Sequence, residues 1–213
     1  MRIYAMIGQC IGGICMFLFV GFPLESWGQK VIQINDLKIE SGYYYVKKAF
    51  LNGQVRAKYT NGKIAFDWKF EEGRPVNGTW LWYFADGKLK KEIIIEDRGY
   101  RTTEKEYYND GKLSEEFGTL DCELDGVCKT YSVEGVLLKE ITYAQGELNG
   151  VARNYYRNGM LMMEYYYVKS RAIGWSSIYR ADGRLREKTK FTDDYATWEV
   201  YYYDETGKEI RTR

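Results

Sequence analysis

The sequence predicts an all-β fold: an elongated, single-layer antiparallel sheet of tandem β-hairpins that repeat every 24 residues. Three observations support this prediction. Turn-type glycines recur at a constant interval, a tyrosine recurs at the same interval, and the composition favours strands, with 21 Tyr and 6 Trp against only 2 Pro.

The turn glycines define the hairpins. Six of them stand 24 residues apart, each after a polar residue: Gly87, Gly111, Gly135, Gly159, Gly183 and Gly207. An earlier Asn61-Gly62 lies 25 residues before Gly87. Asn-Gly and Asp-Gly between apolar segments are the strongest local signal for a hairpin. We therefore predict a two-residue type I′ turn at each glycine. Looser turns between units are expected around Gly78, Gly126, Gly150 and Gly174.

A tyrosine stands four residues before each of the six glycines: Tyr83, Tyr107, Tyr131, Tyr155, Tyr179 and Tyr203. A leucine stands two residues after five of them, beginning with Leu89. Because side chains alternate between the faces of a strand, the tyrosines should form a stripe on one face. A two-residue turn would pair Tyr108 with Leu113 on the other face.

An acidic row, Glu92, Glu116, Glu140 and Glu164, follows the same spacing. Stacked carboxylates can bind cations or perform acid/base chemistry. The predicted register instead pairs them with basic residues: Lys105 with Glu116, Lys129 with Glu140, and Arg153 with Glu164. Opposite charges across a strand pair are an ordinary way to stabilise a sheet. We therefore interpret the row as salt-bridge rungs, with no catalytic or metal-binding residue among them.

The candidate binding surface combines the tyrosine stripe with the densest aromatic run, which extends from Trp80 to Phe84. Its members are Trp80, Trp82, Tyr83, Tyr107, Tyr131, Tyr155, Tyr179 and Tyr203. The stripe has two compatible interpretations. It holds neighbouring hairpins together, or it forms an aromatic platform for a polypeptide or a sugar.

The N-terminus resembles an export signal. Residues 3–22 form an apolar stretch behind Arg2, and small residues precede a cut after Gly28. The alternative is an uncleaved anchor in the inner membrane, because about 20 apolar residues can span a bilayer. We expect a signal peptide or anchor at 1–28, an irregular lead-in at 29–52 and the repeat array at 53–213. The array would then be exported to the periplasm, the cell envelope or the medium.

After such a cut, Cys122 and Cys128 are the remaining cysteines. They flank the segment 123–127, which we expect to be a looser turn. In an oxidising compartment, we predict that they form a disulfide across one hairpin. The alternative is two thiols, and the five-residue spacing is unlike that of redox-active Cys-x-x-Cys motifs.

Charge and composition argue against several functions. The 31 basic and 30 acidic residues nearly balance, so no global field attracts nucleic acid. Histidine is absent, which removes the usual general base and the commonest metal ligand. No Gly-rich phosphate loop is found, so we predict no catalysis and no cofactor.

Units such as residues 149–161, with sequence NGVARNYYRNGML, resemble the MORN-repeat variant of YwqK-type antitoxin-like bacterial proteins. This resemblance covers residues 53–213 and implies a hairpin-repeat scaffold that binds a protein partner without catalysis. The run from Trp80 to Phe84 also resembles the aromatic hairpins of choline-binding repeats. Binding of a cell-wall glycan or a membrane surface is therefore the alternative function.

Overall fold

The chain is almost entirely antiparallel β-structure in the computed structural model. The structure describes residues 52–59, 61–191 and 199–210, and the short strands at 9–11, 14–16, 23–26, 29–33, 37–40, 43–46 and 49–50. These residues form two compact units: residues 1–111 with 118–123, and residues 112–117 with 124–213. We call them unit 1 and unit 2. The predicted all-β hairpin fold is confirmed.

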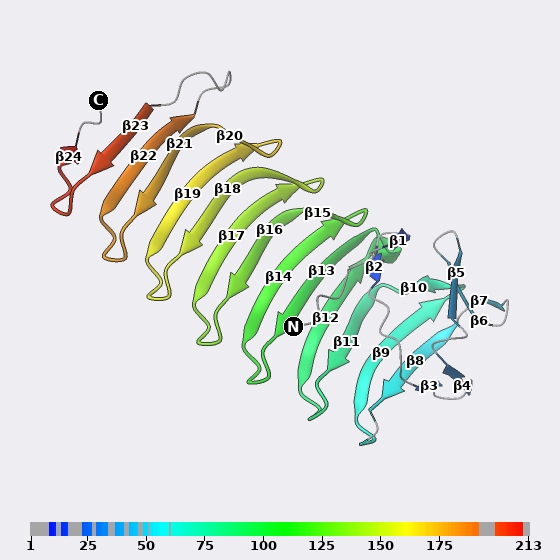
Figure 1. The fold of residues 1–213 in the computed structure, drawn as a ribbon. Coiled ribbons are helices and arrows are strands. Elements are labelled where there is room, and N and C mark those ends of the chain that lie inside the picture. Colours follow the sequence, from blue (N-terminus) through cyan, green and yellow to red (C-terminus); the bar gives the residue numbers. More distant parts are fainter. Residues whose placement is uncertain are drawn as a thin grey trace. The chain divides into compact units, whose positions relative to one another are not determined.

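Unit 1 contains the first complete hairpins of the array. Its main strands are β8 (Gly53–Lys58), β9 (Ile64–Glu71), β10 (Arg74–Pro75), β11 (Gly78–Tyr83), β12 (Leu89–Glu96) and β13 (Arg101–Tyr107). Strands β8, β9, β11, β12 and β13 lie side by side in that order, each antiparallel to the next (Figure 1). Strand β3 (Pro23–Ser26) pairs with β8 and with β4 (Gln29–Gln33).

Two smaller groups of strands precede the array. Strands β1 (Gln9–Ile11) and β2 (Ile14–Met16) pair with each other, and β6 (Tyr43–Val46) lies between β5 (Leu37–Glu40) and β7 (Ala49–Phe50). The lead-in at 29–52 therefore contains strands and is not irregular as predicted. Much of the predicted signal segment, 1–28, lies outside the described residues, so the signal remains a prediction. No helix among the described residues is both long and apolar enough to cross a bilayer.

Unit 2 continues the same pattern. Its strands are β16 (Gly126–Tyr131), β17 (Leu137–Ala144), β18 (Glu147–Tyr155), β19 (Leu161–Val168), β20 (Arg171–Ala172), β21 (Gly174–Tyr179), β22 (Leu185–Phe191), β23 (Glu199–Tyr203) and β24 (Glu209–Ile210). Strands β16 to β19 and β21 to β24 pair in chain order, with β19 joined to β21. Strands β14 (Leu113–Leu120) and β15 (Glu123–Leu124) each contribute residues to both units.

The glycine turns differ from the predicted type. The N–H of Gly159 donates to the carbonyl of Tyr156 at 2.9 Å, and the N–H of Tyr156 donates to the carbonyl of Met160 at 2.8 Å. The loop therefore has three residues, and only its last one, Gly159, has a positive φ. This is the type I turn with a glycine bulge that three-residue hairpins favour. The Asn158 side chain accepts from the N–H of Met160 at 3.0 Å, which explains the polar residue before the glycine.

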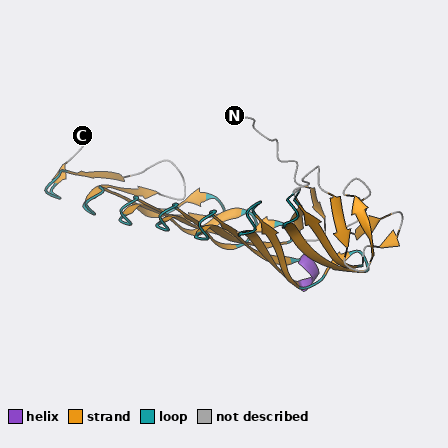
Figure 2. Ribbon diagram, turned by 90° about the horizontal axis from the view of Figure 1, so that it is seen from below, coloured by secondary structure: helices purple, strands orange, loops and turns teal. Residues whose placement is uncertain are grey.

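The turns at the opposite ends of the strands are the ones with positive φ at both central residues, as type I′ turns require. The pairs are Glu72 with Gly73, Asp97 with Arg98, Asp121 with Cys122, Gln145 with Gly146, and Lys169 with Ser170. A short 3₁₀ helix, η2 (Asp97–Gly99), lies at the second of these turns and is drawn in purple in Figure 2. These turns precede Gly78, Gly126, Gly150 and Gly174. The looser turns were predicted over segments such as 72–78 and 146–150, and the tight two-residue turns lie at or beside the start of these segments.

The two units differ in their cores. Unit 1 buries Ala65, Trp68, Phe70, Trp80, Ile93 and Ile95. Among the described residues of unit 2, the buried side chains are the small polar ones of Ser132, Ser176 and Thr189. The apolar side chains described in unit 2 therefore remain at least partly accessible.

Candidate binding surface

The tyrosines predicted as a stripe share one face of the sheet in each unit, which we call the tyrosine face. Tyr83 pairs with Leu89, Tyr131 with Leu137, Tyr155 with Leu161 and Tyr179 with Leu185. The leucine thus lies across from the stripe tyrosine and not from the next residue, as Tyr108 and Leu113 were predicted to do. The three-residue loop causes the difference, because it shifts the register by one until a bulge restores it.

Beyond the bulge, the predicted charge register holds in unit 2. Lys129 lies opposite Glu140, and Arg153 lies opposite Glu164. Arg153 Nε donates to Glu164 at 2.6 Å, and its Nη1 lies 3.4 Å from Glu140. Arg153 therefore bridges two acidic residues on adjacent strands.

Unit 1 carries the same type of contact. Lys105 lies opposite Glu92, with Nζ 3.7 Å from a carboxylate oxygen, and the Tyr107 hydroxyl donates to that carboxylate at 2.7 Å. The pairing of Lys105 with Glu116 remains a prediction. Tyr107 and Glu92 therefore bind each other across neighbouring strands and help to hold the sheet together.

Burial raises the pKa of Tyr155, and the nearby Glu140 carboxylate raises it further. The neutral phenol is therefore retained on this face at physiological pH. It acts as a packing and hydrogen-bonding group and carries no charge.

Side chains at the glycine turns connect each hairpin to the next. The Tyr59 hydroxyl donates to the carbonyl of Tyr83 at 2.7 Å, and the Tyr156 hydroxyl donates to the carbonyl of Tyr179 at 2.8 Å. One unit along from Tyr156, Arg180 Nη2 donates to the carbonyl of Tyr203 at 2.9 Å. This column of side chains was not predicted, although its spacing of one unit is visible in the sequence.

The two tryptophans of the predicted surface are not on the tyrosine face. Trp80 and Trp82 point to the opposite side from Tyr83, because faces alternate along β11. Trp80 is only 1% exposed and stacks on Trp68 with ring centroids 5.0 Å apart. It belongs to the core, so the prediction that it joins the tyrosines in one binding surface was wrong.

A buried ion pair lies beside these tryptophans. Lys91 Nζ is 2.5 Å from a Glu104 carboxylate oxygen and 3.2 Å from Glu106, and it lies 6.0 Å from the centre of the Trp82 ring. Burial disfavours the charged ammonium, but the two carboxylates outweigh burial and raise the pKa of Lys91. Lys91 is therefore held as an ammonium inside unit 1 by its contacts with these carboxylates.

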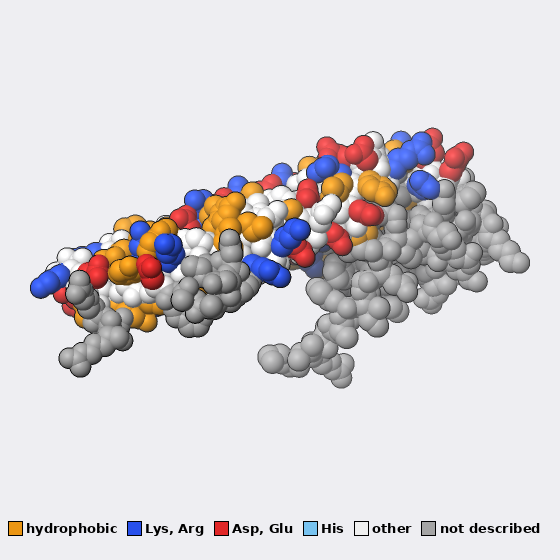
Figure 3. Space-filling view, turned by 90° about the horizontal axis from the view of Figure 1, so that it is seen from above, with side chains coloured by type: hydrophobic (Ala, Val, Ile, Leu, Met, Phe, Trp, Pro, Cys, Tyr) orange, Lys and Arg blue, Asp and Glu red, His pale blue; other side chains and the backbone are white. Residues whose placement is uncertain are grey.

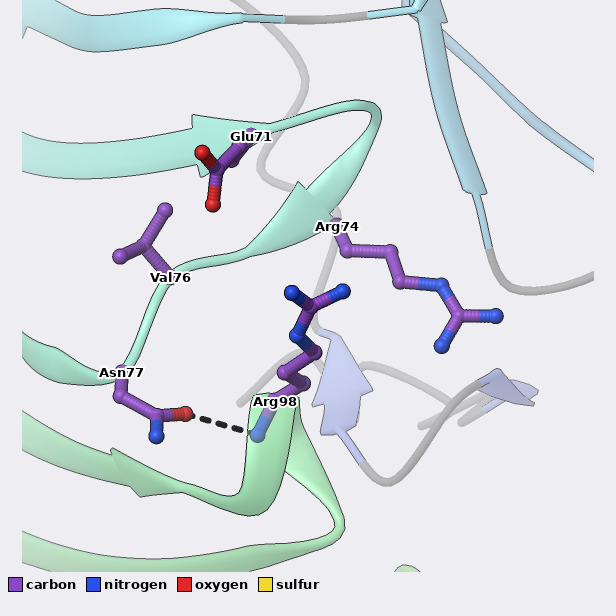
Figure 4. A pocket seen from close by; sticks show the side chains of 5 residues that line it. All are labelled: Glu71, Arg74, Val76, Asn77 and Arg98. Atoms are coloured by element: carbon purple, nitrogen blue, oxygen red, sulfur yellow. Dashed lines mark hydrogen bonds between the residues drawn. The ribbon is translucent and has the colours of Figure 1, made fainter.

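A small polar pocket of about 200 Å³ lies at the type I′ turns of unit 1 (Figure 4). It is lined by Glu71, Arg74, Val76, Asn77 and Arg98. The Asn77 side chain accepts from the backbone N–H of Arg98 at 2.7 Å, which supports the positive φ of Arg98. Two arginines and one glutamate line this pocket, so its charged side chains carry an excess of positive charge.

The two cysteines occupy different kinds of position. Cys122 is a central residue of a type I′ turn, and Cys128 lies within β16. Burial, and then the charge of Glu115, raise the pKa of Cys128 to about 11. Its thiol is therefore protonated and a weak nucleophile at neutral pH. No disulfide joins the two cysteines in the described structure, and the bridge remains a prediction. Nor do the described residues contain a cluster of three acids or cysteines able to hold a metal ion.

The most exposed aromatic group on the tyrosine face lies in unit 2, on β19, β21 and β23. Tyr166 is 46% exposed and Trp175 is 43% exposed. The Trp175 ring lies 5.8 Å from that of Tyr201, and the ammonium groups of Lys188 and Lys190 lie 4.5 and 5.7 Å from its centre. We call these five residues the Trp175 patch.

Sequence reasoning missed this patch because it is not repeated. Units upstream carry valine at the position of Trp175, at Val127 and Val151. A search for the largest change within each repeat column would have found it. Figure 3 shows hydrophobic groups interspersed with both acidic and basic side chains on the viewed face.

Comparison with known proteins agrees with this architecture. Three segments of the chain, residues 76–97, 102–117 and 148–169, match the family described as MORN repeat variant. Each segment covers strands of the hairpin array. The match does not distinguish the YwqK-type subfamily, which remains a prediction. No curated protein matches the chain.

Solved structures that resemble the chain include two of TarM. One is an S. aureus TarM mutant in complex with fondaparinux, alpha-GlcNAc-glycerol and UDP, with 15% identity, 45% of this chain covered and a TM-score of 0.32. The other is TarM itself, with 16% identity, 49% coverage and a TM-score of 0.32. The matched regions span 19% and 20% of the TarM chains. Similarity this low supports no inference about activity.

Proposed function

We propose that this chain is an exported, non-catalytic interaction protein that binds a protein partner through the tyrosine face of unit 2. The exposure of Trp175 and Tyr166 carries the proposal. Large aromatic side chains are favoured at protein interfaces, where they bury much area at little cost in conformational entropy. The MORN-type repeats support a binding role, because such repeats commonly serve as interaction modules.

The arrangement of unit 2 also supports this role. Elsewhere on the tyrosine face, Tyr107 and Arg153 are engaged by acids of neighbouring strands. In contrast, Trp175 contacts Tyr201 and two lysines and remains accessible. It therefore offers an apolar area to a partner without the loss of any sheet contact.

A paired substitution tests the proposal. The tagged full chain would be expressed in its native host and its partners captured from the cell envelope after crosslinking. We expect Trp175→Ser to lose a partner protein that the unchanged chain retains. Tyr202→Ser is the matched control, since Tyr202 is 38% exposed in the same unit but lies on the opposite face. Equal capture by all three chains would reject the tyrosine face of unit 2 as the binding site.

Binding of a cell-wall glycan is the second candidate, favoured by the accessible flat ring of Trp175. A glycan-binding chain should pellet with isolated cell wall and be released by soluble sugar. Retention on the wall that requires Trp175, with no protein partner captured, would replace the first proposal with the second.

A further inference from the structure

The Trp175 patch carries a charge pattern found nowhere else along the described salt-bridge row. In unit 2, Arg153 lies between Glu140 and Glu164 on the two adjacent strands. Lys188 occupies the same row on β22, but its neighbours across the strands are the uncharged Ser177 and Tyr201. The alternation of acid and base therefore stops at Lys188.

Lys190 is the second cation of the patch. Its neighbours across the strands are Trp175 and Glu199. The Glu199 carboxylate accepts a hydrogen bond from the Tyr201 hydroxyl at 2.9 Å. Among the described residues, no carboxylate forms a salt bridge with Lys188 or Lys190. Both ammonium groups instead lie over the Trp175 ring, where they leave the patch with an excess of positive charge.

The spacing of the two lysines indicates the kind of anion. Lys188 and Lys190 are two residues apart on one strand, so their Cα atoms are about 7 Å apart. Alternate side chains of any extended polypeptide have this same separation. A segment lying along β22 could therefore place one carboxylate beside each lysine and an intervening backbone over Trp175.

We infer that Trp175, Lys188 and Lys190 recognise an extended acidic segment of a partner polypeptide, with acidic side chains at alternate positions. This inference rests on the proposed function and specifies the chemistry of the partner. The aromatic rings supply apolar contact area. The lysines select for a negatively charged segment and fix the position of its acidic side chains along β22.

Fluorescence anisotropy of a labelled peptide tests the inference with the full chain. The probe alternates glutamate and valine over about ten residues, which gives the carboxylate spacing of an extended strand. We expect binding that weakens with salt, since the charges at the surface are screened. A peptide with glutamine in place of glutamate should not bind. A peptide of the same composition in which pairs of glutamates alternate with pairs of valines has no two glutamates two residues apart, so it should bind less tightly.

Two variants locate the site. Lys188→Gln should weaken binding by about 2- to 5-fold, the range expected for one exposed charge pair. Trp175→Ser should abolish detectable binding, because the apolar contact area is lost. Lys139→Gln is the matched control and should bind as the unchanged chain does, since Lys139 is exposed in the same unit but lies on the opposite face. Circular dichroism of each variant checks that the sheet is intact.

The outcomes separate this inference from the proposed function. Equal affinity for the glutamate and glutamine peptides would overturn the inference, as would binding unaffected by Lys188→Gln. Binding to anionic lipid vesicles or to an acidic polysaccharide, but not to the peptide, would overturn it in favour of another anion. If the peptide experiment fails but an envelope protein is still captured in a way that requires Trp175, the inference is overturned and the proposed function stands.

Discussion

At the scale of single residues, the buried pair of Lys91 and Glu104 is the most constrained interaction in unit 1. Both side chains are withdrawn from water, so each depends on the other for compensation of its charge. Single surface ion pairs contribute up to about 1 kcal/mol, whereas removal of one member of a buried pair costs about 3 to 5 kcal/mol. The repeat does not require this pair, because the residue one unit before Glu104 is Trp80.

The first prediction concerns this pair. Lys91→Met should destabilise the chain by about 3 to 5 kcal/mol, because it removes the ammonium partner of the buried Glu104 side chain. The double variant Lys91→Met with Glu104→Met should recover much of that loss. Urea unfolding at neutral pH measures the free energy of unfolding of both variants. Lys90→Met, at the neighbouring exposed position, serves as the control and should change stability by less than about 1 kcal/mol.

The same pair predicts a pH dependence. The pKa of Lys91 is raised in the folded state, so the stability it supplies is complete below its unfolded value of 10.5. That stability is lost as the pH rises through the folded pKa. Between pH 9 and strongly alkaline pH, the unchanged chain should therefore lose more stability than the double variant. A parallel loss in the two chains would show that Lys91 is not the group responsible.

At the scale of strands and turns, one glycine is constrained by contact and not only by its backbone conformation. Gly150 lies within β18 with φ +123°, and an added Cβ would approach the side chain of Thr142 to 3.0 Å. Gly126, one unit earlier, also has positive φ, but an added Cβ there would meet nothing within 4 Å. A substitution at Gly126 therefore tests backbone strain alone, whereas the same substitution at Gly150 tests backbone strain together with steric crowding.

The second prediction follows from this comparison. Gly126→Ala should cost about 1 to 2 kcal/mol from the left-handed backbone alone. Gly150→Ala should cost about 1 to 3 kcal/mol more, because Thr142 must also move. Thermal unfolding of the two variants measures the difference. Equal losses would show that the contact with Thr142 is relieved without cost.

The sequence predicted the strands and most of the register because these depend on spacing. The interval between turn glycines and the alternation of side chains were sufficient to pair Arg153 with Glu164. The turn type was not predictable from Asn-Gly or Asp-Gly alone, since the same dipeptides serve two-residue and three-residue loops.

The candidate surface was only partly predictable. A residue type repeated at one position of every unit, such as Tyr131, identifies the contacts that hold hairpins together. Trp175 occurs in one unit only, and its role depends on its exposure in the folded sheet, which the spacing of residues does not predict.

At the scale of the whole molecule, stability should be distributed locally. Each strand contacts its neighbours along the chain, as in other repeat proteins, so a defect should affect adjacent hairpins most. Unit 1 has a buried aromatic core around Trp80, while the described part of unit 2 combines strand pairing, turn contacts and salt bridges with partly accessible aromatic contacts such as that of Tyr165 with Phe191. The two units should therefore respond differently to the loss of a large side chain.

The third prediction tests this distribution. Trp80→Ala should cost about 3 to 5 kcal/mol, the usual range for a fully buried large aromatic residue. Hydrogen exchange measured by mass spectrometry should accelerate in β11 to β13 and remain nearly unchanged in β18 to β22. Trp175→Ala is the control, because its ring is exposed and its loss should leave exchange in both units almost unaltered. Acceleration throughout the chain after Trp80→Ala would indicate that the array unfolds as one cooperative body.

The order of charges along the hairpins limits how such a chain can change in length during evolution. Acidic residues such as Glu140 and Glu164 lie on the second strand of a hairpin, and the basic residue Arg153 lies on the first strand of the next. Duplication of a complete pair of strands, such as β18 and β19, places each copied acid opposite a base. Duplication of a single strand would place like charges opposite each other. It would also reverse the direction of the chain after the duplication, so the following turn would lie at the wrong edge of the sheet. Unequal recombination between copies should therefore yield viable descendants only when it adds or removes whole hairpins.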